Sequence, residues 1–167
     1  MRKIYILKAI VELLWIVTMP IILLIPLMIF LIFNYDLNDL DFFKINDISL
    51  SVSTLLGKVI ISILLLSYGF LIYSLYLFKK TLRYFLQLKI FDNYIIISFH
   101  KIGVLLTIWG MLTSILTFFS RLYFKQKIVF SIGLNEHIVV LCLGLFFMIL
   151  SEVFKIAKNS PRHKTRK

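Results

Sequence analysis

Four long apolar runs dominate the sequence, and shorter polar stretches separate them. The runs cover residues 9–33, 55–78, 102–119 and 138–154. Because an α-helix rises about 1.5 Å per residue, helices of this length match the roughly 30 Å hydrocarbon core of a bilayer. The pattern predicts a single all-α membrane domain over residues 1–167, built as a bundle of four transmembrane helices. Pro20 and Pro26 lie inside the first run, and we expect them to bend its helix.

The connector between the second and third runs has a helical pattern of its own. Polar residues at 79, 80, 83, 87 and 89 alternate with apolar ones at 82, 85, 86, 88, 90 and 91. This spacing predicts an amphipathic helix that continues the second span along the membrane surface. Phe91, Asp92 and Asn93 then form a turn, and Asp92 or Asn93 can cap a new helix. That helix runs through His100 and Lys101 into the third span.

Composition places the protein in a membrane. The 167 residues are 60% hydrophobic, with a mean hydropathy of +0.96, whereas soluble domains are about 45–50% apolar. The net charge of +11 would suggest a nucleic-acid partner in a soluble protein. Here the cations flank apolar runs, so we expect them to meet the bilayer and its anionic lipid headgroups, with no direct binding of nucleic acid.

The distribution of positive charge predicts the orientation. Only five of the 19 Lys and Arg lie in or beside the first and third connectors: Lys44, Lys58, Arg121, Lys125 and Lys127. The others lie at the two termini and in or beside the middle connector. The positive-inside rule therefore places both termini and the middle connector in the cytoplasm, with residues 155–167 as a basic cytoplasmic tail.

Four polar residues near the predicted cytoplasmic ends of the helices form a candidate site: Glu12, His100, Lys101 and Glu152. Charges inside lipid are costly and usually pair within a bundle, so these residues could together bind an ion, a headgroup or a peptide. The alternative is local pairing along each helix, because Lys8 precedes Glu12 by four residues and Lys155 follows Glu152 by three. We favour the local pairs.

A stripe of small or hydroxyl residues follows the third span: Gly103, Thr107, Gly110, Ser114 and Thr117. Small residues allow helix backbones to approach closely. The stripe therefore predicts helix packing, either within the bundle or in a homo-oligomer. The other interpretation is the lining of a polar path.

Two motifs resemble a known family. Phe91, Asp92 and Asn93, followed by residues 100–103, are similar to the signature F-D-x-x-N…L-x-x-I-G, and "ILSEVFKIAK" resembles I-A-E-V-F-K-x-G. Both signatures are typical of a bacterial family of four-helix integral membrane proteins, domain of unknown function 2975. The resemblance implies a multi-pass protein of the bacterial cytoplasmic (inner) membrane and a helix-turn-helix regulator as its cytoplasmic partner. The tail "NSPRHKTRK" departs from the acidic ending of the family.

Motifs for catalysis are missing from the sequence. It contains no G-x-S-x-G, H-E-x-x-H or C-x-x-C and no phosphate-binding glycine loop, so no catalytic residue, metal ligand or cofactor is predicted. We therefore expect a non-enzymatic regulatory or interaction protein that acts through its cytoplasmic face. A small transporter or channel subunit is the first alternative. A lipid-active membrane enzyme that uses Glu12 and Glu152 is the second.

Overall fold

The computed structural model describes residues 2–34, 44–45, 48–49, 54–87, 92–125 and 136–159. These residues form four helices: α1 (Arg2–Asn34), α2 (Leu55–Leu86), α3 (Asn93–Lys125) and α4 (Glu136–Asn159). Two short strands, β1 (Lys44–Ile45) and β2 (Ile48–Ser49), pair antiparallel between α1 and α2. All four helices are long and apolar enough to cross a membrane. The predicted fold class, an all-α four-helix bundle, is confirmed.

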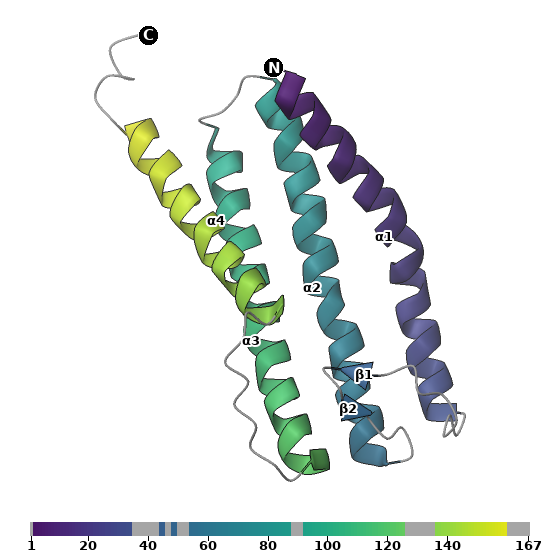
Figure 1. Cartoon of the computed structure of the whole chain (residues 1–167). Coiled ribbons are helices and arrows are strands. Elements are labelled where there is room, and N and C mark those ends of the chain that lie inside the picture. Colours follow the sequence, from purple (N-terminus) through teal and green to yellow (C-terminus); the bar gives the residue numbers. More distant parts are fainter. Residues whose placement is uncertain are drawn as a thin grey trace.

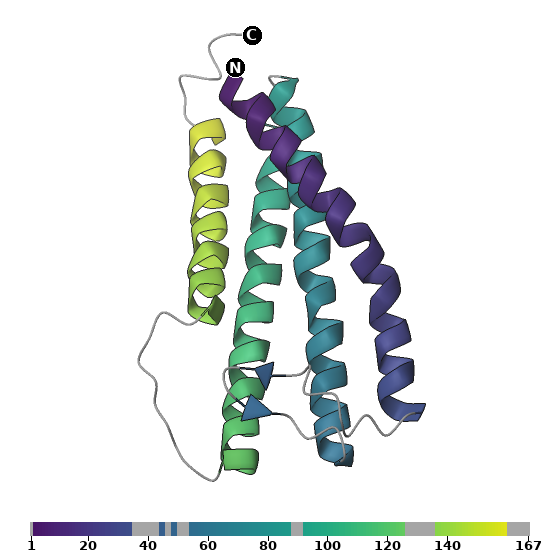
Figure 2. The same cartoon turned by 45° about the vertical axis from the view of Figure 1, so that its right-hand side comes forward.

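The helices run alternately in opposite directions, so the starts of α1 and α3 lie at the same end of the bundle as the ends of α2 and α4 (Figure 1). We call this the basic end. Each helix packs on the next in sequence, with the most extensive packing between α3 and α4. α4 is the shortest and lies beside only the part of α3 toward the basic end (Figure 2). α1, which contains Pro20 and Pro26, is curved and leans across α2.

Each predicted apolar run lies within one helix, and the helix ends follow local chemistry. The Thr54 side chain caps α2 by accepting from the Gly57 backbone N–H at 3.2 Å. The Asp92 carboxylate accepts from the Tyr94 backbone N–H at 3.1 Å, directly before α3 begins. Side-chain oxygens at these positions satisfy backbone N–H groups that have no partner within the helix.

The amphipathic segment after Phe78 differs in direction from the expectation. It extends α2 as one continuous helix to Leu86 and does not turn aside to lie along a membrane surface. The physical reason is packing, because Thr81 and Leu82 are buried in the bundle. Similarly, α4 continues to Asn159 and includes the beginning of the predicted basic tail. Phe91 and residues 160–167 lie outside the described residues.

The core at the basic end is aromatic. The Phe99 ring on α3 stacks against Phe147 and Phe154 of α4, with centroid distances of 5.6 and 5.7 Å. Phe85 of α2 approaches Phe99 at 5.9 Å. Such pairs contribute about 0.5–1.5 kcal/mol each beyond the burial of their area. The cluster fixes α2, α3 and α4 to one another, and Ile95 completes it as a fully buried side chain.

Glycines bring α3 and α4 into close backbone contact. A Cβ atom at Gly103 would lie 2.7 Å from the Gly144 carbonyl oxygen, and one at Gly144 would lie 2.6 Å from Thr107 Oγ1. Gly110 faces the start of α4, where a Cβ would lie 3.2 Å from the His137 carbonyl oxygen. Three members of the predicted stripe therefore lie at the contact between α3 and α4.

The two remaining members of the stripe lie beyond this contact. Thr117 is buried, whereas Ser114 is exposed. Both positions follow Gly110, which is already level with the first turn of α4. The stripe therefore packs against α4 only over Gly103, Thr107 and Gly110.

Candidate functional site

The basic end gathers most of the described charged side chains. Its cations come from all four helices: Lys8, Lys79, Lys80, Arg83, Lys101, Lys155 and Lys158. The carboxylates described there are Glu12, Asp92 and Glu152. Asp92 caps α3. Positive charge therefore exceeds negative charge among the described residues of this end.

The structure does not draw the four residues of the predicted polar site into one cluster. Glu12 pairs with Lys8 at 3.6 Å, and Glu152 pairs with Lys155 at 3.7 Å, each within its own helix. The glutamate side chains are 41% and 59% exposed, where ion pairs contribute about 0–1 kcal/mol. α1 packs on α2 and α4 packs on α3, so the two pairs belong to different helix contacts.

His100 and Lys101 are exposed on α3. Within the described ranges, no three His, Cys, Asp or Glu side chains come close enough to hold a metal ion. The described geometry at Glu12 and Glu152 is that of local ion pairs.

Two lysines of α2 lie against aromatic rings. Lys79 Nζ is 5.4 Å from the centroid of the Trp15 ring on α1, and Lys80 Nζ is 5.0 Å from that of Tyr94 on α3. A cation over a ring face is attracted by the negative potential of that face. These contacts join residues far apart in the sequence, so no periodic signal indicated them.

The predicted turn before α3 is linked to the end of α4. The Lys158 ammonium donates a hydrogen bond to the Asn93 side-chain oxygen. Deeper in the bundle, the Ser151 hydroxyl of α4 donates to the Ile96 carbonyl oxygen of α3 at 2.8 Å. Asn93 therefore acts less as a cap than as an anchor between helices.

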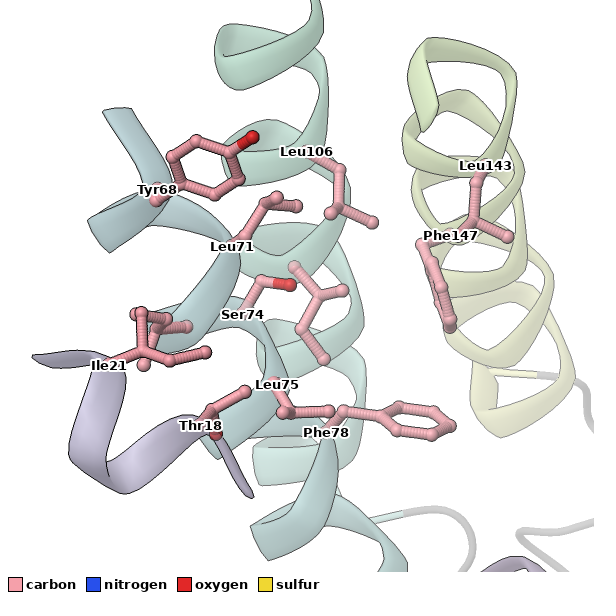
Figure 3. A pocket seen from close by; sticks show the side chains of 12 residues that line it. Thr18, Ile21, Tyr68, Leu71, Ser74, Leu75, Phe78, Leu106, Leu143 and Phe147 are labelled. Atoms are coloured by element: carbon pink, nitrogen blue, oxygen red, sulfur yellow. The ribbon is translucent and has the colours of Figure 1, made fainter. Parts of the chain in front are cut away.

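The structure also contains an apolar groove that sequence reasoning missed. It has a volume of about 410 Å³ and is lined by side chains from all four helices, as Figure 3 shows. Its lining includes Thr18, Tyr68, Ser74, Phe78, Leu106 and Phe147. The lining residues belong to four separate segments, and only the packing of the helices brings them together.

No family model, curated protein or solved structure matches the chain. The fold itself defines the class: four apolar helices that pack as a bundle make this a multi-pass membrane protein. The site of interest is the basic end of that bundle, together with the apolar groove that begins beside it.

Proposed function

We propose that the protein is a non-enzymatic regulatory or interaction protein of the bacterial inner membrane. It acts through its basic end, which faces the cytoplasm, and it binds an acidic surface of a cytoplasmic partner. The orientation rests on the positive-inside rule, since most cations of the sequence lie near the two termini and in or beside the middle connector.

The observation that carries this proposal is the excess of cations without an acidic partner. Glu12 and Glu152 are paired with lysines of their own helices. Arg83 and Lys101 are exposed, and neither forms an ion pair within the described part of the chain. Exposed charges of one sign accelerate association with a surface of the opposite sign and select against the wrong partner.

The nature of the partner is proposed from resemblance. The motifs around Asp92 and Glu152 resemble those of domain of unknown function family 2975, and membership would make a helix-turn-helix regulator the candidate. Such a regulator would present acidic residues to Arg83 and Lys101 and leave its own basic surface free for nucleic acid.

The experiment is photocrosslinking in native membranes. Gln87, exposed at the end of α2, is replaced by a photoreactive residue, and Leu55, exposed at the opposite end of the same helix, serves as the matched control. We expect a defined cytoplasmic protein to be captured from position 87 alone. Capture should fall when Arg83→Gln and Lys101→Gln remove the charges.

Equal capture from positions 87 and 55, or capture that does not respond to the charge changes, would contradict the proposal.

The two alternative functions, a small transporter or channel subunit and a lipid-active membrane enzyme, receive less support. The part of the α3 stripe formed by Gly103, Thr107 and Gly110 is packed against α4, which leaves less room for a polar path within one chain. Glu12 and Glu152 pair locally, which is unlike the coupled carboxylates expected of an enzyme.

A further inference from the structure

The apolar groove has the depth of one membrane leaflet. Along α2 its lining extends from Tyr68 to Phe78, a span of about 15 Å at 1.5 Å per residue. This is half of the roughly 30 Å hydrocarbon core. The Phe78 end of the groove adjoins Lys79 at the basic end, and the Tyr68 end lies near the middle of α2. The groove therefore runs from the membrane interface to the bilayer centre.

The lining is suited to hydrocarbon. Its hydroxyl groups include those of Thr18 and Ser74, and Thr18 already donates to the Trp15 carbonyl oxygen at 3.0 Å. In Figure 3 the lining side chains point toward one another across the space between α2 and α4. Ile21 and Leu143, on opposite walls, are 42% and 45% exposed. The groove thus opens sideways, where a lipid chain can enter directly from the bilayer.

A cation lies at the interfacial end of the groove. Lys79 continues the helical stripe of Tyr68, Ile72 and Leu75, which all line the groove. Its ammonium lies over the Trp15 ring, and tryptophan is typical of the headgroup region. No carboxylate pairs with Lys79 within the described part of the chain. An ammonium in this position is matched in charge to a phosphate.

We propose that the apolar groove binds one acyl chain of an anionic phospholipid from the leaflet at the basic end, with the lipid phosphate at Lys79. The volume of the groove falls within the range of about 300–1,000 Å³ typical of ligand sites. A transmembrane helix of a second copy fits less well, because such a helix needs a surface as long as the whole hydrocarbon core. The lipid site does not depend on the cytoplasmic partner proposed above.

The test is native mass spectrometry of the full chain, purified in detergent and mixed with either phosphatidylglycerol or phosphatidylcholine. We expect the protein to retain one phosphatidylglycerol in preference to phosphatidylcholine. Leu143→Trp fills the groove and should reduce retention about tenfold, because the acyl chain loses its buried methylene contacts. Leu145→Trp is the matched control, since Leu145 is 44% exposed on α4 but does not line the groove.

The headgroup is tested by Lys79→Gln, with Lys101→Gln as the control that removes the same charge elsewhere at the basic end. Lys79→Gln should remove the preference for phosphatidylglycerol, a loss of about tenfold expected for one charge-assisted contact, and Lys101→Gln should keep it. Should Leu143→Trp fail to fold, Ile21→Trp fills the groove from the opposite wall.

Three results would overturn the proposal. The first is equal lipid retention by Leu143→Trp and Leu145→Trp. The second is a wild-type chain that does not distinguish the two lipids. The third is a dimer of the wild-type chain that becomes a monomer in the Leu143→Trp variant. This result would assign the groove to a second copy of the chain.

Discussion

The contact between α3 and α4 predicts that one methyl group at Gly144 will weaken the bundle. A Cβ at this position would lie 2.6 Å from Thr107 Oγ1 and 2.9 Å from both the Gly103 carbonyl oxygen and the Thr107 backbone nitrogen. Thr107 cannot move freely, because its hydroxyl donates to the Gly103 carbonyl oxygen at 2.9 Å. The two helices must therefore separate by several tenths of an ångström, and this loosens their packing.

Two opposing terms set the magnitude of the effect of Gly144→Ala. Overpacking of a close contact costs about 1–3 kcal/mol. Alanine is better than glycine in a helix by about 0.5–1 kcal/mol, which offsets part of the loss. Gly69→Ala provides the matched control, because a Cβ at Gly69 meets no atom within 4 Å. The helix-propensity gain is common to both variants, so Gly144→Ala should be about 1–3 kcal/mol less stable than Gly69→Ala.

The assay is reversible unfolding in mixed micelles of mild detergent and dodecyl sulfate, in a Trp15→Phe background. Trp109 then reports unfolding, because it is buried beside Tyr68 and His137. Gly144→Ala should unfold at a lower dodecyl sulfate fraction than the Trp15→Phe parent, and Gly69→Ala should not. If the two alanine variants unfold at the same dodecyl sulfate fraction, the close approach of α3 and α4 is wrong.

The other predictions concern hydrogen bonds and ion pairs at the basic end. Ser151→Ala removes the hydrogen bond to Ile96 and should lower the free energy of unfolding by about 0.5–1.5 kcal/mol, whereas Ser114→Ala at an exposed position should leave it unchanged in the same assay. Asp92→Ala removes the cap of α3 and should lower the free energy of unfolding by about 0.5–2 kcal/mol. Amide exchange in the first turn of α3 should become faster, and unchanged exchange would refute the capping role. Glu152→Gln affects only an exposed pair and should change stability by less than about 1 kcal/mol. A larger loss would mean that Glu152 belongs to a shared polar site.

The sequence alone determined the features that depend on local chemistry. The apolar runs, a cap at Asp92 or Asn93, and the concentration of cations beside particular runs could all be read without a structure. The reason is that a helix satisfies its own backbone groups, so hydropathy and capping residues are sufficient to place it. The local ion pairs of Glu12 and Glu152 belong to the same category, because their partners lie one helical turn away.

The tertiary structure decided which faces of the helices meet. The stripe of small or hydroxyl residues on α3 was visible in the sequence. The sequence did not show that Gly144 of α4 packs against this stripe, or that Ser114 is exposed beyond the start of α4. The contact of Lys79 with Trp15 and the apolar groove likewise join distant segments. In a bilayer an apolar side chain is satisfied by lipid as well as by protein, so hydropathy does not indicate which face packs. Close van der Waals contact between particular helices makes that choice, and only the assembled bundle reveals it.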